Sequence, residues 1–141
     1  MDARVEWKSG MTFEAYLDGF NFFIDADKQF GGENKGPRPK GLTLVSLAGC
    51  TAMDVISILQ KMRVTVDAFE VATDAVIEEN HPKRILEVLI KYSFKGKNIP
   101  VDKVKHAIEL SQESYCGVSA TLKPSVKLSY QIIINDQVMD G

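Results

Sequence analysis

Apolar and polar residues alternate near the start of the chain, as they do in β-strands that bury one face. Val5 and Trp7 stand two positions apart with charged residues on either side, and the alternation resumes further along. Asp18-Gly19 interrupts it with a dipeptide that favours a tight hairpin turn, because glycine tolerates a positive φ. The pattern predicts a small antiparallel meander over residues 4–25.

A change of hydrophobic period marks the next element. Residues 27–40, DKQFGGENKGPRPK, contain glycines, prolines and mixed charge, which predicts a loop. Pro39 then opens a stretch with helical apolar spacing, and a proline in the first turn costs a helix no hydrogen bond. Apolar residues lie on nearly every side of this helix, predicted over residues 39–63, so we expect it to be buried. One small domain has little material to cover it, which indicates packing against a second chain.

The rest of the chain returns to strand-like patterns around a second helix. Two strands are predicted over residues 64–78 and 84–94, and a helix over residues 99–113. Residues 119–138 are predicted to be strand-like, with clean alternation in their second half. An order of strands, helix, strands, helix and strands is typical of the α+β class. With no internal repeat, it predicts one domain over residues 1–141, built of antiparallel sheets around the long buried helix.

Composition and charge narrow the classes of partner. Hydrophobic residues make up 45% and charged residues 26% of the 141 residues, as in globular proteins, and the net charge is −2. A nucleic acid or an anionic membrane calls for a basic surface, so we expect neither as a partner. No segment is expected to match the roughly 20 apolar residues of a membrane span, and the N-terminus lacks the pattern of a secretory signal. We therefore expect a cytoplasmic protein.

Two cysteines are the main candidates for chemistry, and several interpretations of them are open. A reducing compartment favours free or catalytic thiols over a permanent disulfide, although free cysteine is also a common core residue. Cys50 lies among small residues within the long helix, and Cys116 precedes Gly117 at the end of the shorter one. Such neighbours leave room for a second sulfur or a ligand. A transient disulfide needs Cα atoms about 4.4–6.8 Å apart, which the sequence does not show.

Metal and nucleotide sites are not predicted. Neither His81, beside a proline in a turn, nor His106, within a helix, makes a ligand spacing with the cysteines, so we expect no metal and no cofactor. The Gly-rich part of the loop does not stand between a strand and a helix in the order that cradles phosphates. Asp54 follows Cys50 by one helical turn, where a carboxylate would raise the pKa of the thiol, so we interpret it as a structural or interface group.

Two segments together resemble one known family. RPKGLTLVSLAGCTAMDVISIL is similar to the cysteine helix of the OsmC/Ohr family, whose members handle organic hydroperoxides. SYCGVSATLKPSVKLSYQI is similar to the segment that carries the second cysteine of that family and leads into the last strand. The order of elements agrees as well, so the resemblance covers residues 3–135 and the chain is identified as a divergent member.

The resemblance implies an OsmC-like fold in an intertwined homodimer, with the long helices packed across the dimer and active sites at the subunit interface. It also implies an antioxidant, stress-response thiol peroxidase that reduces organic hydroperoxides. Cys50 would attack the peroxide and become a sulfenic acid, and Cys116 would resolve it as a disulfide that a dithiol then reduces. Neither nucleic acid, membrane nor cofactor takes part in that cycle.

One feature of the family is missing. Typical members carry a glutamate shortly after the proline that begins the helix, and a loop arginine that pairs with it next to the reactive sulfur. Here Lys40 follows the proline and Lys28 stands at the loop position, and lysine lacks the bidentate geometry of arginine. The candidates for binding the substrate or activating the thiolate are therefore Lys28, Glu33, Arg38 and Lys40.

Two other functions stay open at this point. The missing pair favours a non-enzymatic, dimeric binding protein on the same scaffold, with an apolar or sulfur-containing ligand. A bridge between Cys50 and Cys116 that is only structural is the third interpretation. Titration of the thiols before and after peroxide treatment distinguishes the three, because a binding protein keeps both thiols, a structural bridge is already oxidised, and only the peroxidase consumes thiols.

Overall fold

The computed structural model describes residues 1–139. The chain divides into two compact units, Met1–Val45 and the part that begins at Ser46. The boundary between them falls inside the long helix. Whether the two units act as the one domain predicted for residues 1–141 stays a prediction.

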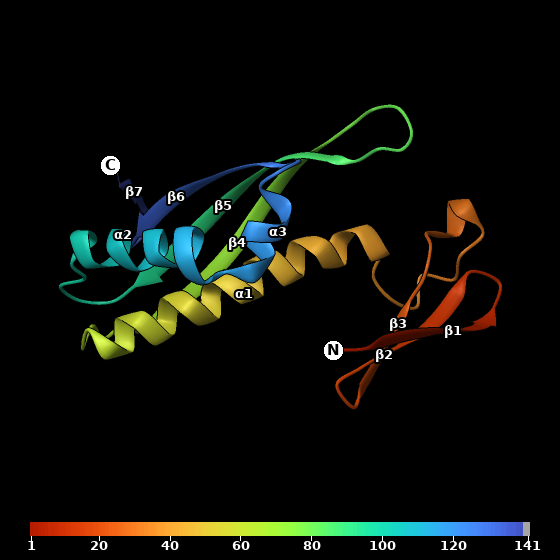
Figure 1. Ribbon diagram of the computed structural model, residues 1–141, viewed down its shortest axis with the longest axis horizontal. Coiled ribbons are helices and arrows are strands. Elements are labelled where there is room, and N and C mark those ends of the chain that lie inside the picture. Colours follow the sequence, from red (N-terminus) through yellow and green to blue (C-terminus); the bar gives the residue numbers. More distant parts are fainter. Residues whose placement is uncertain (140–141) are drawn as a thin grey trace. The chain divides into compact units, whose positions relative to one another are not determined.

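The first unit contains the predicted meander. Strands β1 (Ala3–Ser9), β2 (Thr12–Leu17) and β3 (Phe20–Ile24) form an antiparallel sheet in the order β1-β2-β3 (Figure 1). Asp18 and Gly19 connect β2 to β3 with φ angles of 53° and 83°, the positive values that a type I′ turn requires. The hairpin predicted from this dipeptide is confirmed.

One face of the meander is apolar. The strand register places Trp7 opposite Phe13 and Phe13 opposite Ile24, so these side chains form a row across the sheet. Part of this face is open to solvent, since Trp7 is 64% and Phe20 is 76% exposed. Exposed apolar side chains that share one face of a sheet are a feature of many interaction surfaces.

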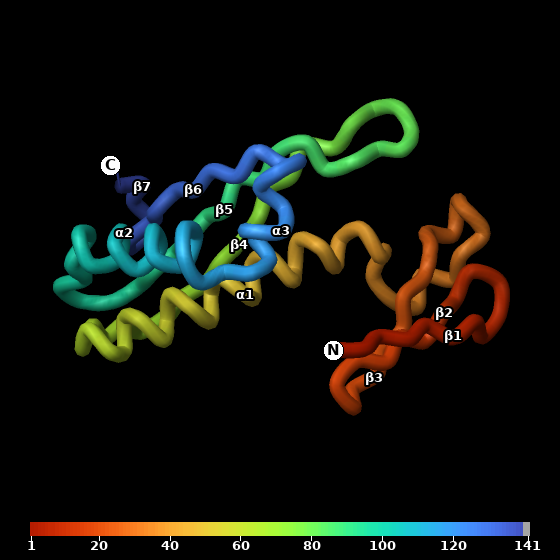
Figure 2. Tube along the Cα trace, viewed as in Figure 1, coloured from red at the N-terminus to blue at the C-terminus, as the bar shows by residue number. Residues whose placement is uncertain are grey.

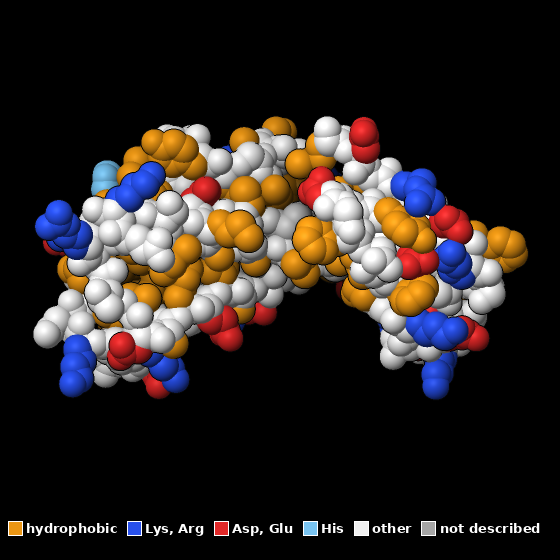
Figure 3. Space-filling model, turned by 90° about the horizontal axis from the view of Figure 1, so that it is seen from below, with side chains coloured by type: hydrophobic (Ala, Val, Ile, Leu, Met, Phe, Trp, Pro, Cys, Tyr) orange, Lys and Arg blue, Asp and Glu red, His pale blue; other side chains and the backbone are white. Residues whose placement is uncertain are grey.

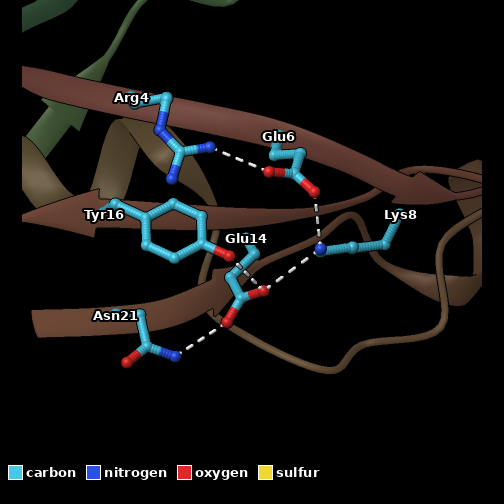
Figure 4. A network of polar contacts seen from close by, with 6 residues as sticks. All are labelled: Arg4, Glu6, Lys8, Glu14, Tyr16 and Asn21. Atoms are coloured by element: carbon cyan, nitrogen blue, oxygen red, sulfur yellow. Dashed lines mark hydrogen bonds and ion pairs between the residues drawn. The ribbon is translucent and has the colours of Figure 1, made fainter.

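The other face of the meander carries a network of charged and polar side chains (Figure 4). Glu6 accepts hydrogen bonds from Arg4 and Lys8, at 2.8 Å each. On the neighbouring strand, Glu14 accepts from the hydroxyl of Tyr16 at 2.7 Å and lies 3.4 Å from the ammonium of Lys8. Exposed ion pairs of this type contribute little to stability, so we interpret the network as a solvated face.

A buried carboxylate organises the loop that follows the meander. Asp25 accepts a hydrogen bond from the hydroxyl of Thr12 at 2.7 Å. The backbone N–H groups of Ala26, Lys35 and Glu33 donate to it at 2.7, 3.2 and 3.4 Å. Burial acts to raise the pKa of Asp25, but these four donors together lower it to about 2. The predicted loop is therefore an ordered segment wrapped around one ionised side chain.

The long helix α1 (Pro39–Lys61) follows the short 3-10 helix η1 (Lys28–Phe30) and begins at the predicted proline. It is buried along one stripe instead of on every side, because the described chain covers only that side. Val45 and Met53, on its other sides, are 65% and 73% exposed. The stripe consists of Leu47, Thr51, Val55 and Leu59.

Hydrophobic side chains gather on the uncovered side of α1 (Figure 3). By length and composition alone α1 could cross a membrane, contrary to the expectation that no segment of this chain is long and apolar enough. The core helix of a soluble protein passes the same test. Because its buried stripe bonds to the sheet of the second unit, we interpret α1 as a core helix.

The second unit is built on a four-stranded sheet in the order β4-β5-β6-β7. β4 (Ala68–Ile77) and β5 (Ile85–Lys95) pair antiparallel, as do β6 (Lys127–Ile134) and β7 (Gln137–Met139). β5 and β6 run parallel, since the chain crosses over between them through a helical segment. The fold class is α+β, as predicted, with this one parallel pair among antiparallel strands of the described chain.

Three short helical segments form the crossover from β5 to β6. α2 (Val101–Leu110) continues into a π-helical turn, η2 (Ser111–Tyr115), and α3 (Gly117–Leu122) follows. The strand predicted from residue 119 is therefore wrong in its first part. GVSATL alternates apolar and polar residues as a strand would, but Cys116 caps a helix here, because its sulfur accepts a hydrogen bond from the backbone N–H of Ser119.

The core of the second unit lies on the side of the sheet where α1 and α2 pack next to each other (Figure 1), and Figure 2 traces the same path of the chain. Tyr92 of β5 is hydrogen-bonded to Thr51 of α1 at 2.7 Å, which ties the helix to the sheet. Phe94 of β5 stacks on Phe69 of β4 with ring centroids 4.6 Å apart. The buried apolar residues of β5 and α2 are Val88, Ile90, Tyr92, Phe94, Val104, Ala107 and Ile108.

Candidate functional site

The structure brings both cysteines and one aspartate together in the second unit. The Sγ atoms of Cys50 and Cys116 and a carboxylate oxygen of Asp54 all lie within 4.8 Å of one another. Both cysteines are free thiols; Cys50 is half-buried and Cys116 is 3% exposed. The expectation that the two sulfurs meet in one place is confirmed.

Cys116 directly follows the π-helical turn η2, which places it beside Cys50. The backbone N–H of Cys116 donates to the carbonyl of Ser111 at 2.7 Å, which closes the widened turn. Cys116 then leaves the helical conformation and caps α3, and the backbone N–H of Ser119 donates to its sulfur at 3.4 Å. The backbone N–H of Val118 donates to the sulfur of Cys50. The first turn of α3 thus offers one N–H group to each sulfur.

A chain of buried hydroxyl groups holds Asp54 in place. Ser111 Oγ donates to Asp54 Oδ2 at 2.9 Å. Because the single proton of Ser111 is used there, Thr51 Oγ1 at 2.8 Å must donate to Ser111, and the hydroxyl of Tyr92 at 2.7 Å must donate to Thr51. Gln112 Nε2 supports the chain from the side, at 2.8 Å from the Tyr92 hydroxyl. Burial raises the pKa of Tyr92 to about 12, so the first donor of the chain keeps its proton.

The surroundings of Cys50 favour the protonated thiol. Burial is the largest influence and raises the pKa of Cys50. The hydrogen bond from Val118 acts in the opposite direction, while the neighbouring Cys116 sulfur and the Asp54 carboxylate raise the pKa further. Since the thiolate is the nucleophilic form, a reaction at Cys50 near neutral pH needs a group that removes the thiol proton.

A cavity of about 600 Å³ opens beside Asp54, between α1 and the end of the α2–η2 segment. Its size is that of a site for a small organic ligand. Most of its wall is apolar, and the Asp54 carboxylate and the Lys61 side chain are its charged groups. The apolar side chains of the wall are those of Met53, Ile58, Met62, Leu110 and Tyr115.

The same three donor atoms are of the kinds that bind a zinc ion, namely two sulfurs and one carboxylate oxygen. Structural zinc sites normally use four protein ligands, and among the described residues this cluster supplies three. The prediction that the protein holds no metal stays a prediction.

The four other residues predicted for the site lie in the first unit. Arg38 donates to the carbonyl of Gly36 at 2.9 Å and lies 3.4 Å from the carboxylate of Asp27. Glu33 pairs with Lys35 at 2.8 Å. Lys28 and Lys40 are exposed. A role for Lys28, Glu33, Arg38 or Lys40 next to the reactive sulfur stays a prediction.

The hydrogen bond that Asp54 accepts from Ser111 fits its interpretation as a structural or interface group, which stays a prediction, but its place beside both sulfurs was not predicted. The spacing from Cys50 to Asp54 placed the two on one side of the helix, and this was the available signal. The expected repulsion between a thiolate and a carboxylate led to its interpretation as a structural group. Ser111, which orients it, is far away in the sequence and left no motif.

Comparison with known proteins agrees with this architecture. The profile of the family described as OsmC-like protein matches residues 32–131. Protein YhfA of Escherichia coli K12 is 32% identical over 136 residues, which are 94% of this chain and 98% of YhfA. A hypothetical protein from Aquifex aeolicus is 32% identical with a TM-score of 0.80, over 95% of this chain and 96% of that one. An organic hydroperoxide resistance protein from Elizabethkingia anophelis, solved with thiocyanate bound, shares the fold at 15% identity with a TM-score of 0.71, over 94% of each chain. The chain therefore belongs to the OsmC-like protein family.

Proposed function

We propose that this protein is a thiol-dependent peroxidase that reduces organic hydroperoxides. The observation that carries the proposal is the meeting of two free thiols, with their sulfur atoms within 4.8 Å of each other. A sulfenic acid formed on one sulfur condenses readily with a second thiol at such a distance. The fold shared with an organic hydroperoxide resistance protein supports the choice of substrate.

In this proposal Cys50 attacks the peroxide and Cys116 resolves the product. The sulfur of Cys50 bonds to the terminal oxygen of the hydroperoxide, the O–O bond breaks, and an alcohol leaves. The thiol of Cys116 then displaces water from the sulfenic acid, and a dithiol reductant regenerates both thiols. The half-buried position of Cys50, against 3% exposure for Cys116, favours Cys50 as the group that meets the peroxide.

We further propose that the protein acts as a cytoplasmic homodimer. The apolar face of the meander and the uncovered side of α1 are surfaces that a second copy would bury. Lys28, Glu33, Arg38 and Lys40 are the candidates that would supply charge to the site in such an assembly. Equilibrium sedimentation tests the assembly, and a monomer at micromolar concentration would contradict it.

The peroxidase proposal is tested with single cysteine variants. With cumene hydroperoxide and a dithiol, Cys50→Ser is expected to abolish peroxide consumption. Cys116→Ser is expected to allow one turnover and to leave a sulfenic acid on Cys50, which a dimedone adduct on that residue reveals. Consumption by Cys50→Ser at the wild-type rate would overturn the assignment of the two roles.

A second candidate function is a dimeric binding protein for an apolar or sulfur-containing ligand. It is favoured by the raised pKa of Cys50, because the groups that act most on this thiol include no cation. The cavity beside Asp54 would then hold the ligand. Thiol titration decides between the two, since a binding protein keeps both thiols after exposure to peroxide.

A further inference from the structure

Both chemical steps of the proposed cycle move a thiol proton onto a leaving oxygen. We propose that Asp54 is the catalytic acid–base group that carries this proton in both steps, an inference that rests on the proposed peroxidase function. The same carboxylate would thus serve Cys50 first and Cys116 second. No positive charge at the sulfur is then required for the thiol to react.

The geometry that carries the inference is the position of Asp54 relative to the two sulfurs. One carboxylate oxygen lies within 4.8 Å of the sulfur of Cys50 and within 4.8 Å of that of Cys116. A separation of this size is bridged by one water molecule or by a small tightening when the substrate binds. Among the described residues, Asp54 is the carboxylate that this cluster contains.

The chain of hydroxyl groups orients the Asp54 carboxylate through one of its two oxygens. Ser111 donates to Oδ2 at 2.9 Å, and the donors behind it, Thr51 and Tyr92, leave Ser111 no other orientation. Oδ2 therefore has a fixed donor, and in this proposal the other carboxylate oxygen accepts the thiol proton. The chain would also stabilise the carboxylate each time it gives its proton away.

Asp54 also borders the space from which a substrate would arrive. It lines the apolar cavity of about 600 Å³, between Met53 and Ile58 on α1 and Tyr115 on η2. The described residues that line the cavity include Asp54 but neither cysteine, and the sulfur of Cys50 lies within 4.8 Å of the Asp54 carboxylate oxygen. A hydroperoxide that enters from this cavity would therefore meet Asp54 before it reaches Cys50.

The first step balances with no additional reactant. The thiol proton of Cys50 passes to Asp54, the sulfur bonds to the terminal oxygen of the hydroperoxide, and the O–O bond breaks. The remaining alkoxide takes the proton from Asp54 and leaves as an alcohol, so that Cys50 is a sulfenic acid and Asp54 is again a carboxylate.

The second step repeats the transfer at the other sulfur. The thiol proton of Cys116 passes to Asp54, its sulfur bonds to the sulfur of Cys50, and the S–O bond breaks. The hydroxide that leaves takes the proton and becomes water. Over the two steps the two thiols lose two electrons in total, and the O–O bond of the hydroperoxide accepts them, giving one alcohol, one water and one disulfide.

A purely electrostatic role for Asp54 predicts an effect of opposite sign. Its carboxylate raises the pKa of Cys50, so removing the charge would increase the fraction of thiolate. If that were its whole influence, Asp54→Asn would oxidise faster than the wild type near pH 7. If Asp54 carries the proton, the same variant is slower, by about 10-fold or more, because general acid–base catalysis contributes roughly 10²–10⁴-fold.

The experiment measures the rate of Cys50 oxidation by cumene hydroperoxide from pH 6 to pH 8.5, by quenched alkylation of the remaining thiol. The wild type is expected to show a nearly flat profile, because a carboxylate and a thiol act together across this range. Asp54→Asn is expected to be slow at pH 7 and to accelerate about tenfold per pH unit as the free thiolate forms. Asp54→Glu is expected to recover part of the rate.

Glu113→Gln is the matched control, since it removes one exposed carboxylate from η2, the turn whose Ser111 orients Asp54, and is expected to keep the wild-type profile. A wild-type profile that rises tenfold per pH unit would overturn the proposal even if no Asp54 variant folds. An Asp54→Asn rate equal to or above that of the wild type at pH 7 would overturn it while leaving the peroxidase intact. A wild type that does not oxidise at all would overturn both.

Discussion

Each unit of the chain contains an aspartate held by a hydroxyl group, and the two carboxylates are held in different ways. Asp25 of the first unit accepts from four donors, which lower its pKa to about 2 against the effect of burial. Asp54 of the second unit accepts a hydrogen bond from Ser111 and lies next to two thiols. The carboxylate with four donors supports a loop, whereas the proposed role of the one beside the sulfurs is to exchange a proton.

The backbone around each aspartate explains this difference. Asp25 directly follows strand β3 and begins a glycine-rich loop, whose backbone N–H groups turn towards it. Asp54 lies inside α1, where the backbone N–H groups are already used by the helix, so only side chains such as Ser111 can reach it. The conformation of the chain thus decides how many donors each carboxylate receives.

The largest difference in stability between the two units is expected from a glycine substitution in each. A Cβ on Gly36 would lie 2.0 Å from the carbonyl oxygen of Phe23, so Gly36→Ala must displace the backbone of the loop around Asp25. We expect it to lower the free energy of unfolding by about 2 kcal/mol or more. Gly49→Ala, within α1, meets nothing within 4 Å and is expected to stabilise by about 0.5–1 kcal/mol. Chemical denaturation measures both.

Equal free energies of unfolding for the two variants would contradict the description of the loop around Asp25 as an ordered segment.

The next largest difference is expected when each aspartate is changed to asparagine. Asp25→Asn replaces an ionised acceptor of four hydrogen bonds by a neutral amide with a single acceptor oxygen, so we expect a clear fall in Tm. Asp54→Asn keeps an acceptor for Ser111, so we expect its Tm to stay close to that of the wild type. Calorimetry measures both variants. A larger fall in Tm for Asp54→Asn would reverse the proposed division of roles.

Acid is expected to act on the first unit through Asp25. Its pKa is about 2 in the folded chain and about 3.9 when unfolded, so its contribution is complete above pH 4 and disappears as the pH falls towards 2. Thermal unfolding between pH 5 and pH 2 should show this loss in the wild type. The Asp25→Asn variant should lack this part of the acid dependence. An identical acid dependence in both proteins would assign the effect to other groups.

The smallest expected effect concerns the hydroxyl chain behind Asp54. Tyr92→Phe removes the first donor of the chain but leaves Gln112 to donate to Thr51. We expect a loss of about 1 kcal/mol in the free energy of unfolding, and a modest slowing of Cys50 oxidation because Asp54 is less firmly oriented. Denaturation and the oxidation rate measure the two effects. If Tyr92→Phe does not fold, the chain of hydroxyl groups is needed mainly for stability and not for orienting Asp54.

The thiol site could be predicted from the sequence because each of its two cysteines lies in a segment that resembles a cysteine segment of a known family. The meander could be predicted from the period of two, and the hairpin from Asp18-Gly19. Both features depend on residues that are close together in the sequence, and the spacing of apolar residues predicts structure at that range. The pairing of Cys50 with Cys116 depended on a resemblance, since no local rule brings α1 and α3 together.

The features that were missed depend on contacts between distant segments. The helix α3 replaced the start of a predicted strand, because its cap is the Cys116 sulfur and its boundary is set by the π-helical turn before it. The limited cover of α1 agrees with the prediction that one chain has too little material to bury it, and burial of its other sides by a second chain stays a prediction. The hydrogen bond from Ser111 to Asp54 could not be predicted, because no local pattern links these two residues.

The most direct test is to treat the reduced wild-type protein with one equivalent of cumene hydroperoxide, to block free thiols, and to map the peptides by mass spectrometry without reduction. The proposed peroxidase cycle predicts one linked species in which the peptide of Cys50 is joined to that of Cys116, and its disappearance after a dithiol is added. Two peptides that both carry the blocking group, with the peroxide unconsumed, would contradict it.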